Sequence, residues 1–199
     1  MKYNDRKEKG MSGIQAIDES ILLWVQEHIR SDKVTPIIQT LTHLGDFGLL
    51  WIGFSLVLML NKDTRKAGKL SLISICLCFL LNNIIIKNLV DRDRPYEVLN
   101  ELKILIERQP DSSFPSGHAA NSLASAIVFF QMFKGKKSKF TILMAGIVIA
   151  LSRVYVGVHY LSDVLVGISV GIVSGLSVCK VAMNKEKKKI LRKLENLDF

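Results

Sequence analysis

Long apolar stretches, separated by short lysine-rich segments, dominate the hydrophobic pattern of the chain beyond residue 45. An α-helix needs about 20 apolar residues, with a range of roughly 17–25, to cross the hydrocarbon core of a bilayer. Several of these stretches are near that length, and the first is short. We therefore predict five membrane-spanning helices, over residues 47–60, 70–86, 116–133, 140–158 and 160–183. The expected fold class is an all-α polytopic membrane protein, a helical bundle of five or six transmembrane helices.

The first 45 residues follow a different pattern, that of an N-terminal amphipathic helix. Aliphatic side chains recur there at helical spacing, at Ile14, Ile17, Ile21, Val25 and Ile29. Acidic residues lie off this stripe, so the segment is too charged to span comfortably and is expected in the membrane interface or against the bundle. Pro36 marks a break, and a second helix is predicted over residues 37–43, ending near Gly45.

These patterns divide the chain into three parts. We predict an N-terminal polar and amphipathic interfacial segment over residues 1–45, a membrane domain over residues 46–183 and a basic cytoplasmic tail over residues 184–199. No long linker and no second soluble domain is visible in the sequence. Residues 1–13 are polar and the segment after them is charged, so we expect no cleavable signal peptide.

The composition agrees with a membrane protein, because 49% of the 199 residues are hydrophobic and the mean hydropathy is +0.27. The net charge of +9 would suit a nucleic-acid partner, but the lysines lie in loops and in the tail, without a basic face that carries aromatic residues. No nucleic-acid partner is therefore expected. Cys76, Cys78 and Cys179 lie within apolar runs without metal-ligand spacing, which predicts small buried side chains and no metal site.

The placement of lysine and arginine predicts the orientation in the membrane. These residues gather in the loop after the first span, in the loop after the third span and in the tail, which alternation places on one side. Cytoplasmic loops carry an excess of positive charge, so this side is expected to be cytoplasmic. The segment before the third span then falls on the extracytoplasmic side, together with the turn near His159. The basic N-terminus prefers the inside, which a sixth crossing through residues 14–45 would allow.

Two groups of residues at the ends of predicted spans have the chemistry of an anion site. Lys87 and Arg94 lie where the second span leaves the membrane. The lysine offers phosphate oxygens a point charge, and the arginine offers them a planar guanidinium with several N–H donors. Cations that merely reach out from a helix end are the alternative. At the start of the third span Ser116 is a good N-cap, and the free N–H groups beside Gly117 form an anion site next to His118. An ordinary helix cap with an incidental histidine is the alternative there.

A third group spans the turn between the last two predicted helices. Arg153 is a charged residue inside a span, which by default suggests function. His159 and Asp163 are four residues apart, so a helical turn would bring the carboxylate within reach of the ring and fix its tautomer. The alternative is that His159 and Asp163 form a structural pair that only stabilises the end of a helix. Asp163 also continues a stripe of small residues that permits close helix packing, formed by Gly167, Gly171 and Gly175, so it is expected to face the bundle.

In chain order the three groups read KNLVDRDRP from Lys87, PSGH from Pro115 and SRVYVGVHYLSD from Ser152. They resemble the tripartite signature of the type 2 phosphatidic acid phosphatase (PAP2) superfamily at every defining position. That superfamily includes bacterial lipid and polyprenyl-diphosphate phosphatases, glucose-6-phosphatase and vanadium haloperoxidases. The resemblance covers Lys87 to Asp163, and the first 45 residues carry little of it.

The resemblance implies a role for each residue of the signature. His159 would be the nucleophile that forms a phosphohistidine, Asp163 would orient it, and His118 would protonate the leaving oxygen. The phosphate would be held by a set of cations, a hydroxyl and a backbone amide from Lys87, Arg94, Ser116, Gly117 and Arg153. Similar family members need no metal, so no cofactor is expected. His28 and His43 lack such neighbours and are assigned no catalytic role.

The function expected is that of a membrane lipid phosphatase. Undecaprenyl diphosphate is the favoured substrate, because the small five- or six-span form and an outward-facing site resemble bacterial carrier-recycling enzymes. Phosphatidylglycerophosphate, phosphatidic acid, diacylglycerol pyrophosphate and lipid A remain open, and a PSGH segment is less typical of polyprenyl-diphosphate phosphatases than PSDH. A vanadate-dependent haloperoxidase is a second class, although those relatives are soluble. A non-enzymatic lipid transporter is a third, although no defining residue is lost.

Overall fold

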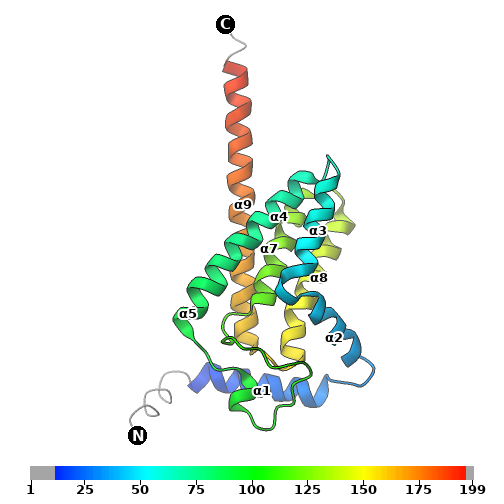
Figure 1. Cartoon of the computed structure of the whole chain (residues 1–199), viewed down its shortest axis with the longest axis vertical. Coiled ribbons are helices and arrows are strands. Elements are labelled where there is room, and N and C mark those ends of the chain that lie inside the picture. The colour runs from blue at the N-terminus through cyan, green and yellow to red at the C-terminus, as the bar shows by residue number, and fades with distance from the viewer. Residues whose placement is uncertain (1–11, 196–199) are drawn as a thin grey trace.

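The computed structural model describes residues 12–195, and every regular element in that range is helical (Figure 1). The elements of the N-terminal half are α1 (Ser12–His28), α2 (Thr35–Leu44), η1 (Asp46–Gly48), α3 (Leu49–Leu60), α4 (Arg65–Phe79) and η2 (Leu80–Ile86). Those of the C-terminal half are α5 (Lys87–Val90), α6 (Pro95–Val98), α7 (Gly117–Met132), α8 (Lys136–Tyr155) and α9 (Leu161–Glu195). The predicted all-α fold is confirmed.

A helix lies at each of the five predicted spans, with boundaries that differ by a few residues except at the end of α9, which extends to Glu195. By length and composition three helical stretches could cross a membrane, namely Arg65–Val98, Lys136–Tyr155 and Leu161–Lys189. The pair α2 and α3 is a fourth candidate, bent by 58° at the break between them. Helix α4 continues through the π-helical turn η2 into α5, and such turns are frequent at functional sites.

Helix α7 is the centre of the bundle and packs against α4, α8 and α9. Its buried face consists largely of small residues, among them Ala119, Ala120 and Ala124. Small side chains let neighbouring helices approach closely, which is the usual packing device of helices in membranes. Around this contact, Leu123 of α7, Val154 of α8 and Val164 of α9 form one buried apolar cluster.

The glycine stripe of α9 faces α7, as predicted. A Cβ atom on Gly167 would lie 2.5 Å from the carbonyl oxygen of Ser116, and one on Gly171 would lie 2.3 Å from that of Ala120. One on Gly175 would lie 2.9 Å from the carbonyl oxygen of Ala124. These distances are too short for any side chain, so the two backbones are in direct contact at three positions over about two turns. Asp163 is fully buried at the start of the same stripe.

The other end of α9 extends well past the bundle (Figure 1). The helix has 35 residues and so is about 50 Å long at 1.5 Å per residue. It runs without a break from the membrane domain into the predicted basic tail, as far as Glu195. Helix α9 therefore continues past residue 183, the predicted end of the membrane domain. Residues 196–199 of that tail, and the basic residues of the first 11 positions, lie outside the described residues.

Helix α1 lies across the end of the bundle at which α7 and α9 begin (Figure 1). Part of its aliphatic stripe points away from the bundle, because Ile14 and Ile17 are 69% and 61% exposed, whereas Val25 packs against the buried core. The face turned to the bundle centres on Asp18 and Leu22, both buried. The predicted helix is thus present, with a mixed polar and apolar contact to the bundle and exposed aliphatic residues near its start.

One prediction about a cysteine is wrong. Cys78 and Cys179 are buried, as expected, but Cys76 is exposed on the outer face of α4. Successive residues of a helix point in directions about 100° apart, so Cys76 and Cys78 cannot share one face. All three thiols are free.

We expect Gly171→Ala to destabilise the protein by about 1–3 kcal/mol, because the added methyl group would overlap backbone atoms of α7. The matched control is Gly53→Ala in α3, where a Cβ atom meets nothing within 4 Å. Thermal unfolding in detergent should show a lower midpoint for Gly171→Ala and an unchanged or higher one for Gly53→Ala. Equal midpoints for the two variants would contradict the close packing of α7 and α9.

Candidate functional site

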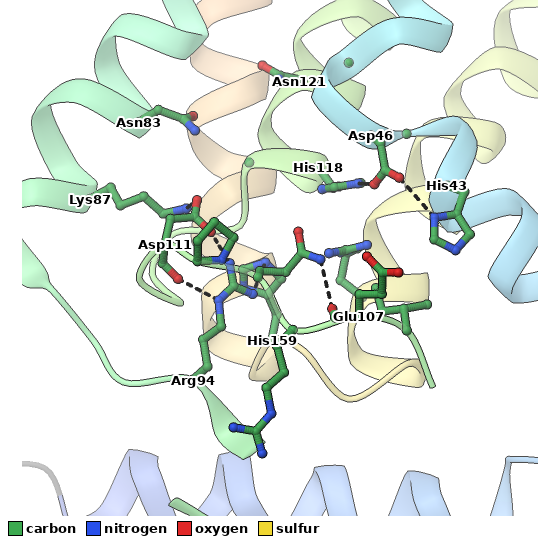
Figure 2. Close-up of a pocket in the computed structure, with 18 of the residues that line it drawn as sticks. His43, Asp46, Asn83, Lys87, Arg94, Glu107, Asp111, His118, Asn121 and His159 are labelled. Atoms are coloured by element: carbon green, nitrogen blue, oxygen red, sulfur yellow. Dashed lines mark hydrogen bonds and ion pairs between the residues drawn. The ribbon is translucent and has the colours of Figure 1, made fainter. Parts of the chain in front are cut away.

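The three sequence groups meet at one cavity of about 680 Å³ at the end of the bundle covered by α1 (Figure 2). Six predicted site residues line the cavity, namely Lys87, Arg94, Gly117, His118, Arg153 and His159. The remaining two, Ser116 and Asp163, are buried directly behind it. The structure therefore brings all eight predicted residues together, and their roles stay predictions.

The PSGH segment forms the start of α7, as expected. Ser116 is the N-cap residue, and its Oγ accepts a hydrogen bond from the amide of Ala119 at 3.5 Å. Its own amide donates to the carbonyl oxygen of Asp163 at 3.1 Å, which joins the beginnings of α7 and α9. His118 lies in the first turn of α7 and points into the cavity (Figure 2).

A tight turn between α8 and α9 places His159. Gly157 has a φ of 84°, a left-handed conformation that other residues rarely adopt, and this reverses the chain after α8. A Cβ atom at Gly157 would also lie 2.8 Å from a guanidinium nitrogen of Arg30. His159 follows two residues later with its ring buried at the floor of the cavity.

Asp163 lies beside His159, but the direct hydrogen bond expected between them is not formed. The Nδ1 atom of His159 is 3.6 Å from Oδ2 of Asp163, too far for a hydrogen bond. Ser113 lies between them: its Oγ is 3.5 Å from that nitrogen and donates to Oδ2 at 2.5 Å. The amide of Tyr160 also donates to Oδ2, at 2.9 Å. The carboxylate thus reaches the ring largely through the Ser113 hydroxyl.

These contacts orient the ring of His159. With Nδ1 turned to Ser113 and Asp163, the other nitrogen, Nε2, faces the cavity and lies 3.4 Å from Nη1 of Arg94. A proton on Nδ1 would leave the lone pair of Nε2 exposed to a bound anion. The ring is therefore held with Nε2 directed toward the cavity.

The other oxygen of Asp163 is held by Arg92, a residue that sequence reasoning missed. Arg92 Nη1 donates to Oδ1 of Asp163 at 2.6 Å, and its Nη2 donates to Asp18 of α1 at 2.8 Å. Asp18 also accepts a hydrogen bond from the amide of Ser162 at 3.0 Å. A buried charge needs such pairing, so α1 is tied through Arg92 to the carboxylate behind His159. Arg92 lies inside the first sequence group, which was its only signal.

Three buried cations surround the cavity, and two of them share one carboxylate. Asp111 forms ion pairs with Lys87 and with Arg94, the latter at 2.6 Å. Arg94 Nε also donates to the backbone oxygen of Asp111 at 2.7 Å. The third cation, Arg153, donates through Nη1 to Oγ1 of Thr42 at 2.7 Å. Nothing in the sequence pointed to Asp111, which lies in an irregular segment 17 residues after Arg94.

His118 has a carboxylate partner too. Its Nε2 lies 2.8 Å from Oδ1 of Asp46, and the other oxygen of Asp46 lies 3.0 Å from Nδ1 of His43. His43 thus contacts a carboxylate three residues further along the chain. Asn83 and Asn121 line the cavity above His118 (Figure 2).

The electrostatics of the cavity follow from this arrangement. Burial lowers the pKa of His159 below its ordinary value of 6.5, and the charges of Arg94 and Arg153 add to this effect against the attraction of Asp163. Burial would raise the pKa of Asp111, but its contacts with Lys87 and Arg94 prevail and hold it at about 2. The hydrogen bond with His118 holds the pKa of Asp46 at about 2 as well.

At neutral pH the site therefore combines a neutral imidazole with several fixed cations. Such a cavity can hold a tetrahedral oxyanion and present a nitrogen lone pair to it. Among the described residues, no group of three or more histidine, cysteine, aspartate or glutamate side chains has the arrangement of a metal site.

Comparison with known proteins places this site in a family. Residues 68–187 match the sequence model of the PAP2 superfamily. The undecaprenyl-diphosphatase of Sulfolobus acidocaldarius is 29% identical over 141 residues, which cover 70% of this chain and 68% of that protein. The phosphatidylglycerophosphatase B of Bacillus subtilis is 30% identical over 175 residues, which cover 81% of each chain.

A solved structure shares the fold over most of its length. The crystal structure of a transmembrane PAP2-type phosphatidylglycerolphosphate phosphatase from Bacillus subtilis superimposes with a TM-score of 0.69. The superposition covers 86% of this chain and 87% of that one, at 27% sequence identity.

We expect stability to fall as the pH drops below about 6.5, because the unfolded chain protonates His159 there while the folded protein keeps it neutral. The loss is at most about 1.4 kcal/mol per pH unit for one group. Asp46 and Asp111 add to this loss of stability only when the pH falls below about 3.8, the ordinary pKa of an aspartate. Thermal unfolding of wild type and His159→Gln in detergent between pH 7.5 and 4.5 tests this.

The variant should lose less stability than wild type over this range, while His28→Gln, a change at an exposed histidine, should follow wild type. Parallel curves for wild type and His159→Gln would show that the folded protein does not exclude a proton from this ring.

Proposed function

The chain belongs to the PAP2 superfamily, and on this premise we propose that it is an integral membrane lipid phosphatase that acts through a phosphohistidine on His159. One observation carries the proposal. Nε2 of His159 faces a cavity in which Lys87 and Arg94 meet Arg153 from a distant part of the chain. Buried cations are costly unless an anion accompanies them, so their gathering beside an oriented imidazole fits phosphate binding and transfer.

The reaction follows in two steps. Nε2 of His159 attacks phosphorus, the bond from phosphorus to the leaving oxygen breaks, and protonated His118 gives its proton to that oxygen. A water molecule then attacks the phosphohistidine and gives a proton to His118, which releases inorganic phosphate and restores neutral His159. Lys87, Arg94 and Arg153 stabilise the charge on the phosphoryl oxygens in both steps. Ser116 and the amide of Gly117 at the start of α7 would add hydrogen bonds to these oxygens.

The proposal places the protein in the cytoplasmic membrane with five crossings, by α3, α4 with η2, α7, α8 and α9. The lysine-rich loops then face the cytoplasm, and the cavity opens at the extracytoplasmic surface. The exposed aliphatic face of α1, with Ile14 and Ile17, supports this placement, because the helix lies across the cavity end of the bundle, where lipid headgroups would be.

For the substrate we propose undecaprenyl diphosphate, cleaved to the monophosphate and phosphate, as the first lipid to test. It is the substrate in the name of the archaeal relative, while the relative from Bacillus subtilis is named for phosphatidylglycerophosphate. Both substrates carry a phosphate in the lipid headgroup, and the cavity residues would bind this phosphate rather than the lipid tail. Phosphate release from a panel that also contains phosphatidic acid, diacylglycerol pyrophosphate and lipid A would distinguish these candidate substrates.

We expect purified protein in detergent with EDTA to release phosphate from at least one lipid of this panel, and His159→Ala to lower the rate at least about a thousandfold. The matched control is His28→Ala, the same change at an exposed histidine of α1. Release of phosphate by His159→Ala at a rate near that of wild type would disprove the nucleophile assigned. No release from any lipid by wild type would disprove the proposed activity.

Asp111 should compete with phosphate for Lys87 and Arg94, since one carboxylate holds both. Asp111→Asn removes that competitor, so inorganic phosphate and orthovanadate should inhibit the variant at about tenfold lower concentrations than wild type. Glu107→Gln is the matched control, because Glu107 lines the cavity on the side away from Lys87 (Figure 2). Equal inhibition of Asp111→Asn and wild type would show that Asp111 does not occupy the phosphate position.

A further inference from the structure

We propose that Asp46 is a positioning residue that holds His118 as the general acid of the reaction, an inference that rests on the proposed function. The Nε2 atom of His118 is 2.8 Å from Oδ1 of Asp46. Because Nε2 is engaged there, Nδ1 is the ring nitrogen left for the leaving oxygen. A carboxylate bonded to one ring nitrogen fixes the tautomer and direction of the other.

Asp46 is itself held from its other side. Its Oδ2 lies 3.0 Å from Nδ1 of His43, so each of its two oxygens contacts a histidine (Figure 2). His43 is 57% exposed and Asp46 33%, whereas His118 is 13% exposed. The three side chains therefore lead from the solvent to the cavity, with the carboxylate in the middle.

The backbone around Asp46 is shaped to fit the ring of His118. A Cβ atom on Gly45 would lie 2.9 Å from Cδ2 of His118 and 2.8 Å from Cγ2 of Ile149. Any other residue at this position would therefore displace one of these two side chains. Three residues earlier, Thr42 is fully buried and accepts the hydrogen bond from Arg153. The short segment from Thr42 to Asp46 thus contacts the site at three points.

This segment lies outside residues 68–187, the range that matches the superfamily. It also straddles the boundary predicted at residue 45 between an interfacial segment and the membrane domain. The break between α2 and α3, at η1, is what turns Asp46 toward the start of α7. The end of α2 and η1 therefore complete a site that the signature residues alone leave open on the side of His118.

The chemistry expected of Asp46 is specific. When protonated His118 gives its Nδ1 proton to the leaving oxygen, its Nε2 proton stays in the hydrogen bond to Asp46. In the second step Nδ1 accepts a proton from the attacking water, and the same hydrogen bond stabilises the cation that forms. Burial opposes that charge most strongly and Arg153 and Arg94 add to it, while the hydrogen bond to Asp46 favours the protonated ring.

The test compares wild type with Asp46→Asn, Asp46→Glu and His118→Ala, in detergent with EDTA. One substrate is phosphatidic acid, whose leaving alcohol needs a proton, and the other is p-nitrophenyl phosphate, whose leaving phenolate does not. We expect Asp46→Asn to lower kcat/KM about 10- to 100-fold on phosphatidic acid, a smaller loss than the roughly 10²–10⁴-fold contribution of the general acid itself. On p-nitrophenyl phosphate kcat/KM, which reports only the steps up to release of the phenolate, should stay near that of wild type, and this also shows that the variant is folded.

A second readout is the pH profile. Without the carboxylate, His118 should lose its proton more readily, so the alkaline limb of kcat in Asp46→Asn should move to lower pH by on the order of one unit. Asp46→Glu keeps the charge and should recover part of both effects. Asp63→Asn, the same change at an exposed aspartate between α3 and α4, should match wild type in both readouts.

Three outcomes are decisive. A loss for Asp46→Asn that is equal on the two substrates, with no change in the pH profile, would overturn the positioning role. So would full activity of Asp46→Asn on phosphatidic acid when His118→Ala is impaired there. A wild-type protein that releases phosphate from neither compound nor from any lipid of the panel would instead overturn the proposed function, and this inference with it.

Discussion

The direct contact between the backbones of α7 and α9 is the constraint on which the rest of the structure depends. Three glycines of α9 face carbonyl oxygens of α7 at distances that exclude any side chain. Because the helices cannot slide past one another without a clash, their first turns are held in register, and the amide of Ser116 reaches the carbonyl oxygen of Asp163. That register brings the PSGH segment next to the turn that carries His159. Two groups more than 30 residues apart in the sequence thus become one site.

Charge balance is the second requirement, because the cavity end of the bundle buries several arginines and a lysine. Lys87, Arg92 and Arg94 form ion pairs inside the protein, and Arg153 donates a hydrogen bond to Thr42. Arg92 links Asp18 of α1 to Asp163, so the N-terminal helix stabilises the carboxylate behind His159. Asp111 neutralises Lys87 and Arg94 while the cavity holds no anion. A bound phosphate would take over that second role, which makes the free site stable and still open to substrate.

The sequence predicted the helical class, the approximate place of each bundle helix and all eight residues that gather at the cavity. It succeeded where the signal is local, as in the glycine stripe that turned Asp163 inward and the N-cap at Ser116. It failed where a partner comes from a distant segment, since Asp46 meets His118 across 72 residues and Arg92 meets Asp18 across 74. No periodicity reveals such pairs. The division at residue 45 stays a prediction, although Thr42 contacts Arg153 across it in the folded chain.

The central claim is that phosphate passes through Nε2 of His159 on its way from lipid to water. Wild-type protein mixed with a lipid substrate labelled in the transferred phosphate, and quenched in alkali during turnover, tests this claim most directly. Proteolysis and mass spectrometry should then find the label on a single peptide, attached to His159, in an amount that falls when the substrate is exhausted. Label on another residue, or no protein-bound label while phosphate is being released, would contradict the account.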